Sequence, residues 1–324
     1  MSRNISLDTV RAAASRIYPV AARTPLIPLD PVGRHSPEIY LKLEVFQPIG
    51  SFKIRGAMNA VSKLTPAELS GGVWTVSAGN AAQGVALAAR EAGAKASVLV
   101  MDTAPKAKLA NIERLGATIV QATYDECWKT VESHRSDRMT GRFVHPFDDD
   151  DFISGNGTAA LEILEDLPDV DAVIAPIGGG GLLAGLGTVL QALRPDARLY
   201  GAEPETAAPL AASLRANAPM RFDTWTASFV DGAGGKSVLP SMWPLLSSSV
   251  SESIVVTLAE AAEAMRFVAE RRRIVMEGAA ACAVAAARSP RLAAAGHRKI
   301  VAVVSGGNID LSKFASLVGA CREA

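Results

Sequence analysis

The chain has 324 residues, 49% of them hydrophobic, and its 33 lysines and arginines balance 33 aspartates and glutamates. This length can supply the core of one large domain or of two ordinary ones. The charge balance excludes the strong basic field that attracts nucleic acid or an anionic membrane, so we expect a small-molecule partner. We expect the short charged runs at residues 148–151 and 271–273 to be solvated.

The cysteines and the possible targeting segments indicate in which compartment we expect the protein. Cys127, Cys282 and Cys321 are far apart and form no CxxC pair, which argues against a disulfide framework or a cysteine zinc site. Charges run through the N-terminal residues, where a secretory signal would have an apolar core. The uncharged stretch 172–193 is interrupted by Pro176 and by glycines, which predicts a strand, a turn and a helix rather than a membrane span. We expect a cytoplasmic protein.

Short apolar runs rich in β-branched residues alternate with helical patterns along the chain. Ser6 can cap a first helix in which Val10, Ala13, Ala14 and Ile17 share one face. The expected strands are residues 39–45, 73–76, 96–101, 118–121, 172–177, 199–203 and 299–304. The expected helices include residues 83–92, 106–115, 158–164, 182–193 and 278–287. This alternation predicts an α/β fold with mostly parallel, twisted sheets that helices cover on both faces.

The units between residues 72 and 148 form a set of their own. The acidic segment 145–151 would lead the chain back out of this set. We therefore predict two lobes: a large domain of residues 1–71 and 149–324, and a small domain of residues 72–148 inserted into it.

A lysine turn, residues 50–57 with the sequence GSFKIRGA, follows the expected strand 39–45. Glycines bound it, so Lys53 could be held against backbone. A partly desolvated amine loses its proton more easily and becomes a nucleophile that forms Schiff bases. Because most lysines are simply exposed, this hypothesis depends on the other stretches.

A tetraglycine loop, Gly178 to Gly181, follows a buried strand and opens a helix at Leu182. Bare N–H groups at the start of a helix make an anion site suited to a phosphate. A tight turn that needs glycine for packing alone is the plainer interpretation, and four glycines in succession make it the weaker one.

Two further polar turns follow expected strands. The SAGN turn, residues 77–84 with the sequence SAGNAAQG, offers backbone N–H groups and the side chains of Ser77, Asn80 and Gln83 to a carboxylate or a ring hydroxyl. A helix cap by Ser77 or Asn80 is the structural alternative. The SGGN turn, Ser305 to Asn308, follows the last strand in the same way. Open α/β sheets bind ligands at the carboxyl ends of their strands.

The tetraglycine loop also permits a rival function. Gly179, Gly181 and Ala184 match the G-x-G-x-x-A form of the dinucleotide fingerprint, and Glu203 follows at about the place of a ribose-binding acid. An NAD-dependent oxidoreductase would use these residues but would leave Lys53 without a role.

Together, and in this order and spacing, the four stretches resemble the fold type II pyridoxal-phosphate enzymes, within them the threonine and serine dehydratase and serine racemase family. The resemblance covers nearly the whole chain. It implies that Lys53 holds pyridoxal 5'-phosphate as a Schiff base, that Phe52 lies by its ring and that Asn80 binds its 3′-oxygen. The phosphate would lie on the tetraglycine loop and Leu182, and Ser305 would face the pyridine nitrogen.

The resemblance also implies a substrate site and a reaction. The substrate carboxylate would be held by Ser77 and the start of the following helix, where Ala78, Gly79, Ala81 and Gln83 lie. The expected reaction is the dehydration and deamination of a β-hydroxy-α-amino acid such as L-threonine or L-serine to a 2-oxo acid and ammonia. We expect a homodimer or another homo-oligomer.

Several positions depart from the family pattern. Racemases of the family have a serine at the position of Ala78, which makes racemisation a weaker alternative. Ala81 replaces a usual histidine and Phe147 a frequent asparagine, so a bulkier substrate such as a β-aryl serine or hydroxyaspartate is an alternative. A divalent-cation site known in some relatives would use Glu203 and the Ala207 carbonyl, but its third ligand falls at Pro209. We therefore expect no metal. A cofactor-binding protein without catalysis is a third possibility.

Overall fold

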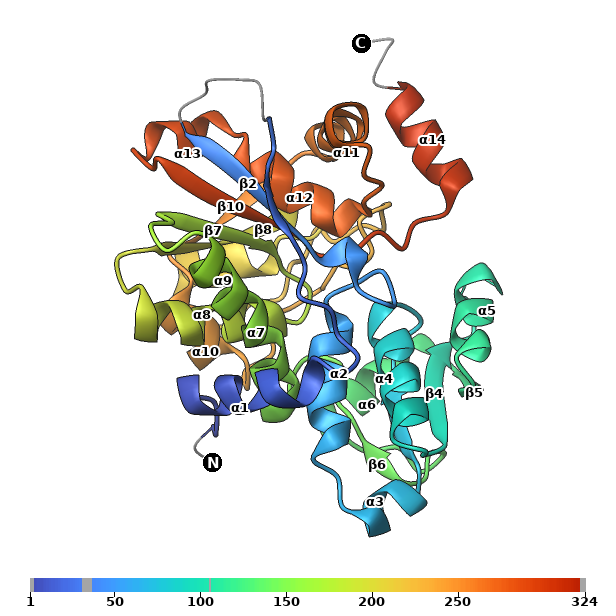
Figure 1. Cartoon of the computed structure of the whole chain (residues 1–324). Helices are drawn as coiled ribbons and strands as arrows, with labels where there is room; N and C mark the ends of the chain where they lie inside the picture. The colour runs from blue at the N-terminus through green and yellow to red at the C-terminus, as the bar shows by residue number, and fades with distance from the viewer. Residues whose placement is uncertain (1–2, 31–36, 105, 321–324) are drawn as a thin grey trace.

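The structure, a computed structural model, describes residues 3–30, 37–104 and 106–320, so Cys321 lies outside the described ranges. Two sheets lie side by side, the larger at the upper left of Figure 1 and the smaller at the lower right. Within the described residues, no helix is both long enough and apolar enough to cross a bilayer.

The larger sheet has six strands in the order β1-β2-β10-β7-β8-β9, and the smaller has four in the order β5-β4-β3-β6. The strands are β1 (Leu26–Pro28), β2 (Glu38–Leu43), β3 (Val73–Val76), β4 (Ala96–Met101), β5 (Thr118–Ala122), β6 (Arg142–Phe143), β7 (Ala172–Pro176), β8 (Arg198–Pro204), β9 (Glu252–Val256) and β10 (Lys299–Val304). All strand pairs are parallel except β1 with β2. The predicted α/β fold class is confirmed.

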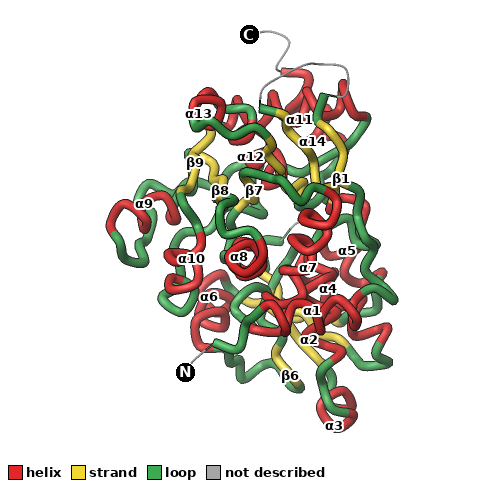
Figure 2. The backbone as a smooth tube through the Cα atoms, turned by 60° about the vertical axis from the view of Figure 1, so that its left-hand side comes forward, coloured by secondary structure: helices red, strands yellow, loops and turns green. Residues whose placement is uncertain are grey.

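Helices cover both faces of the larger sheet. They are α1 (Leu7–Ile17), α2 (Lys53–Ser62), α3 (Pro66–Ser70), α4 (Asn80–Glu91), α5 (Lys106–Arg114), α6 (Tyr124–Ser133), α7 (Asp150–Asp166), α8 (Gly181–Leu193), α9 (Pro209–Ala216), α10 (Trp243–Ser249), α11 (Leu258–Arg272), α12 (Gly278–Ala287), α13 (Pro290–Ala294) and α14 (Leu311–Ala320), with the 3-10 helix η1 (Glu44–Phe46). In Figure 2, α8 and α10 lie below strands β7 to β9, and α11, α12 and α13 lie above them.

Alternating side chains of the central strands explain the two covered faces. Val173 and Ala175 of β7 belong to the core shared with α7 and α8, whereas Ala172 and Ile174 belong to the core shared with α12. Every residue of α12 is buried, because its small side chains let the helix lie close to the sheet.

The smaller sheet is built from residues between Val73 and Phe143, and the larger sheet from strands on either side of that stretch. A substrate-binding role for the smaller part stays a prediction. One expectation about the returning segment is wrong: Asp148 is buried, not solvated, because its carboxylate accepts hydrogen bonds from Arg3 and from Ser241, both at 2.6 Å. Asp149 caps α7, which begins well before the expected residue 158.

Candidate active site

The lysine turn is fastened to the SGGN turn by a short backbone ladder. Ser51 forms an antiparallel bridge with Gly306. The Phe52 N–H donates to the Ser305 carbonyl at 3.0 Å, and the Gly307 N–H donates to the Gly50 carbonyl at 2.9 Å. Because β2 and β10 are parallel neighbours, the turns that follow them meet at one edge of the sheet.

Lys53 begins α2 with Phe52 as the N-cap residue. Its Nζ donates to the Pro146 carbonyl at 2.6 Å and lies 5.2 Å from the ring centre of Phe52 and 5.3 Å from that of Phe152. In the described part of the chain it forms no ion pair with a carboxylate. Burial lowers the pKa of Lys53 to about 8, and the charge of Glu277 only partly opposes this. A nucleophilic, neutral amine is therefore accessible near neutral pH.

Asn80 connects the three turns. Asn308 Nδ2 donates to the Ile49 carbonyl and to Asn80 Oδ1, both at 2.7 Å. Asn80 Nδ2 in turn donates to Glu277 Oε1 at 2.8 Å. With its Oδ1 occupied by Asn308, the Asn80 amide keeps its N–H groups for acceptors on the other side.

Glu277 is a site residue that the sequence did not indicate. It is the N-cap residue of α12 and buried, and burial, helped by Asp231, raises its pKa to about 7, while the Asn80 hydrogen bond acts in the opposite sense. A single glutamate before an alanine-rich helix is no recognisable signal. Only the spatial approach of α12 to the SAGN turn reveals it.

The tetraglycine loop leaves no room for side chains. A Cβ at Gly178 would lie 2.7 Å from the Gly232 carbonyl oxygen, and one at Gly179 would lie 2.1 Å from the Phe147 ring. Gly180 has a φ of 91° and is the N-cap residue of α8. The glycines of the loop put no side chain of their own over the backbone N–H groups at the start of α8, which suits an anion site. Leu182 packs into the core, so it offers only its backbone.

Residues predicted to contact the substrate lie in different surroundings. Ser77 Oγ accepts from the Gly79 N–H at 3.1 Å and so shapes the SAGN turn, in which Ala78 and Gly79 are half-buried. Ala81 is buried at the start of α4. Gln83 lines a neighbouring cavity of about 530 Å³ together with Gly50 and Asn308. Phe147 lies against the tetraglycine loop.

The candidate cation ligands do not fit a metal. Glu203 Oε1 accepts from the Leu210 N–H at 2.7 Å, and Oε2 accepts from the Ala211 N–H at 2.8 Å and from Ser253 Oγ at 2.6 Å. The carboxylate thus caps α9, whose first residue is Pro209. The same contacts leave Glu203 unsuited to a ribose, so the dinucleotide alternative loses its acidic residue.

One cluster with metal-binding side chains occurs among the described residues. Candidate ligand atoms of His134, His145 and Asp148 lie within 4.8 Å of one another. Both ring nitrogens of His145 and both carboxylate oxygens of Asp148 already have hydrogen-bond partners. The cluster is therefore a hydrogen-bonded unit.

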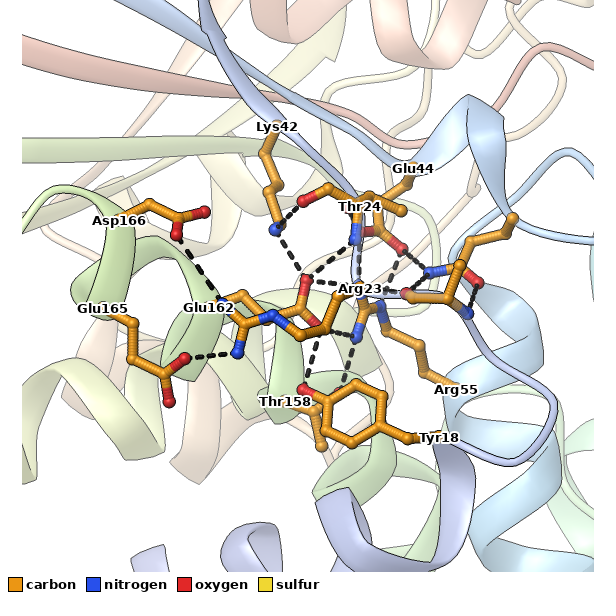
Figure 3. Close-up of polar contacts among 12 residues, drawn as sticks. Tyr18, Arg23, Thr24, Lys42, Glu44, Arg55, Thr158, Glu162, Glu165 and Asp166 are labelled. Atoms are coloured by element: carbon orange, nitrogen blue, oxygen red, sulfur yellow. Dashed lines mark hydrogen bonds and ion pairs between the residues drawn. The ribbon is translucent and has the colours of Figure 1, made fainter.

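Arg55 of the lysine turn belongs to a buried network of ion pairs (Figure 3). The Arg55 guanidinium binds Glu44 through Nε at 2.7 Å and Glu162 through Nη1 at 2.6 Å. Lys42 Nζ donates to Glu162 at 2.6 Å, and the Tyr18 hydroxyl donates to the same carboxylate at 2.8 Å. Burial disfavours these charges, but the mutual contacts hold the pKa of Arg55 above, and that of Glu162 below, its ordinary value.

Comparisons with known proteins agree on one family. The sequence model of the family described as "Pyridoxal-phosphate dependent enzyme" matches residues 17–306. The L-threonine ammonia-lyase of Thermotoga maritima is 37% identical over 318 residues, which are 97% of this chain and 78% of that protein. The L-threo-3-hydroxyaspartate ammonia-lyase of a Pseudomonas species is 35% identical over 97% of this chain and 98% of its own length. The structure of maize serine racemase superposes with a TM-score of 0.87, at 32% identity, over 98% of both chains.

Proposed function

The chain belongs to the pyridoxal-phosphate dependent enzyme family, and on this premise we propose that it is a lyase that releases ammonia from a β-hydroxy-α-amino acid, with L-threonine and L-serine as first candidates. The observation that carries the proposal is the Lys53 amine, which is half-buried, faces a carbonyl rather than a carboxylate, and has a pKa lowered to about 8. Such an amine can bind a carbonyl compound covalently and can also accept a proton.

The residues at the site fit the cofactor. Lys53 would hold its aldehyde carbon, the N–H groups of Gly178 to Leu182 would bind its phosphate, and Asn80 would donate to its ring oxygen. Ser305, which is buried at the end of β10, would lie by the pyridine nitrogen, and Phe52 by the ring. Close packing requires glycine at Gly178 and Gly179, where a Cβ would strike the Gly232 carbonyl or the Phe147 ring, and the lack of side chains leaves the N–H groups of the loop available to an anion. Bound pyridoxal phosphate supplies an electron sink for charge that develops at the substrate Cα.

Different residues of the chain would then orient the substrate, remove its proton and limit the access of water. Backbone N–H groups of the SAGN turn would orient the substrate carboxylate, with Ser77 holding the turn in shape. The Lys53 amine would remove the Cα proton, and loss of the β-hydroxyl would follow. The Phe52 and Phe152 rings would keep water from the amine. The hydroxyl would leave as water, and the unsaturated amine released from the enzyme would take up water to give a 2-oxo acid and ammonia.

Substrate choice is the open part of the proposal. Ala78 has no hydroxyl to serve as a second acid or base, which favours elimination over racemisation. The similarity to a hydroxyaspartate ammonia-lyase supports a bulkier, acidic substrate as the second candidate. The half-buried Phe147 would give the site an apolar wall, which a β-aryl serine could also use.

A substrate panel tests the proposal. Purified protein with pyridoxal phosphate should be yellow and should release a 2-oxo acid from at least one of L-threonine, L-serine, L-threo-3-hydroxyaspartate and L-threo-phenylserine. Assay of D-amino acid in the same samples measures racemisation. A yellow protein that releases no 2-oxo acid from the panel would contradict the lyase, and a protein that takes up no cofactor would contradict the site.

We also place the enzyme in a reducing compartment such as the cytoplasm, because Cys127 and Cys282 are both unpaired and buried. A homodimer is our proposal for its assembly. The apolar side chains of Phe46 and Leu311, which are 55% and 70% exposed, are ones that a subunit interface could cover. Light scattering coupled to size-exclusion chromatography would measure the mass directly.

A further inference from the structure

His145 lies where the chain returns from the smaller sheet and has no role in the chemistry described so far. The side chain is 2% exposed. Its ring is packed between those of His134 and Phe147, at centre distances of 4.5 and 4.6 Å, and Phe143 lies 5.5 Å away. Burial lowers the pKa of His145, so the ring is neutral at ordinary pH.

Hydrogen bonds fix one tautomer of this neutral ring. Nδ1 accepts from the Phe147 N–H at 3.2 Å and from the Asp148 N–H at 2.7 Å. Nε2 lies 3.1 Å from the Val131 carbonyl of α6, so Nε2 carries the proton and donates it there. The ring therefore joins the turn at residues 145–148 to α6.

The turn that His145 shapes reaches the active site in two places. The Pro146 carbonyl accepts from Lys53 Nζ at 2.6 Å, and the Phe147 ring covers Gly179 of the tetraglycine loop. Proline has no N–H of its own, so the turn around Pro146 depends on the N–H groups of the next two residues, which the His145 ring accepts. A change at His145 is thus transmitted to the carbonyl that contacts the amine.

We propose that the Pro146 carbonyl holds the free amine of Lys53 during proton removal, and that His145 is the positioning residue that aims this carbonyl. An amine that donates one N–H to a fixed acceptor has only two directions left for its lone pair. Proton transfer depends on this alignment, and a misplacement of about 1 Å can cost on the order of 100-fold in rate. The inference deepens the proposed function and rests on it.

Three substitutions distinguish the hydrogen bonds of Nδ1 from the hydrogen bond of Nε2. His145→Asn places an amide oxygen near the Nδ1 position and can still accept the turn's N–H groups. His145→Gln reaches toward the Nε2 position and restores only the contact with Val131. His145→Leu removes both. Val131→Ala is the matched control, because it loosens the same helix while leaving the Val131 carbonyl in place.

Steady-state turnover of the holoenzyme is the first measurement. We expect the Leu and Gln variants to lose kcat by about 100-fold with KM changed less than about threefold, and the Asn variant to stay within about threefold of wild type. A purely structural role would instead lower the melting temperature of all variants, the Val131 control included, without separating Asn from Gln. Equal kcat for the Asn and Gln variants would overturn the proposal, whether or not the Leu variant folds.

The second measurement does not depend on turnover. Cofactor-free protein is mixed with pyridoxal phosphate, and the rate at which the yellow band appears reports the reactivity of the Lys53 amine. We expect this rate to fall at least tenfold in the Gln variant and little in the Asn variant, and equal rates would count against the inference. If wild-type protein takes up no cofactor or turns over no substrate, the proposed function itself is contradicted. If only the His145 variants behave differently from expectation, this inference alone is contradicted.

Discussion

Helix α2 carries two cations two residues apart, and their surroundings are opposite. Arg55 is fully buried and lies between the carboxylates of Glu44 and Glu162, which it binds with four hydrogen bonds of 2.6 to 2.8 Å. Lys53 is half-buried and faces a carbonyl and two phenyl rings. Burial alone disfavours both charges, so the difference in pKa comes from the carboxylates.

The comparison shows how one short segment can combine a firmly anchored side chain with a reactive one. Arg55 is anchored by charge and cannot lose its proton, which fixes the first turn of α2. Lys53, at the start of the same helix, lacks such partners and can alternate between charged and neutral forms. Each prediction below either changes the surroundings or the side chain of one of these two residues, or measures the pKa of Lys53.

Lys53→Ala should have the largest effect. Without the amine, covalent attachment of the cofactor and proton removal are both lost, so activity should fall by at least about 1,000-fold and the yellow colour should disappear. Absorbance and 2-oxo acid release measure the two effects. Lys63→Ala, in the C-cap residue of the same helix, is the control and should keep both. A colourless but fully active Lys53 variant would refute the assignment.

Arg55→Met should destabilise the fold by about 3–5 kcal/mol, because two carboxylates would stay buried without their cation. Denaturant unfolding measures the free energy. Adding Glu44→Gln to this variant should recover part of the loss, since one uncompensated charge is then removed. Arg23→Met, whose contacts with Glu165 and Asp166 are exposed, should cost only about 0.2–1 kcal/mol. If Arg55→Met lowered the free energy of unfolding by as little as Arg23→Met, the buried network would have to be accessible to water.

The rate of cofactor capture by cofactor-free protein should depend on pH through Lys53. Only the neutral amine attacks, so the rate should rise about tenfold per pH unit below the midpoint and level off above it. With the pKa lowered to about 8, the midpoint should lie there rather than near 10.5. Stopped-flow absorbance across this range locates it. A midpoint above 10 would show that the amine is solvated.

Glu277→Gln should have the smallest effect, and unlike the substitutions above it should speed a reaction of Lys53, the capture of the cofactor. The negative charge of Glu277 favours the protonated form of Lys53, so its removal should move the capture midpoint to lower pH and speed capture about twofold at neutral pH. The Gln oxygen can still accept from Asn80. Glu263→Gln, at an exposed ion pair with Arg288, is the charge-matched control. An unchanged midpoint would place Glu277 too far from the amine to act on it.

Much of this arrangement could be predicted from the sequence because it follows local rules. Strands 73–76, 96–101 and 299–304 have the predicted bounds, and so does helix 278–287. β-branched runs and alanine-rich periodicity determine such elements within the segment itself. The lysine turn and the tetraglycine loop were recognisable for the same reason, since glycines bound both.

Features that depend on distant partners could not be predicted in this way. The acidic run predicts a solvated Asp148, but Arg3 and Ser241, which are 145 and 93 residues away in the sequence, make its burial possible. Glu277, His145 and the Arg55 network depend equally on residues brought together by the fold. A sequence pattern describes neighbours along the chain, and charge compensation depends on neighbours in space.

The ladder between Ser51 and Gly306 sets the order in which the enzyme becomes competent. Translation delivers the lysine turn long before the SGGN turn, and at about 5–20 residues per second the delay is on the order of tens of seconds. During that interval β2 lacks β10, its neighbour in the finished sheet, and Lys53 lacks the backbone that seats it. We therefore expect the lysine of a nascent chain on the ribosome to have an ordinary pKa and to be protonated. Cofactor capture becomes a late event of synthesis, tied to the arrival of the last strand.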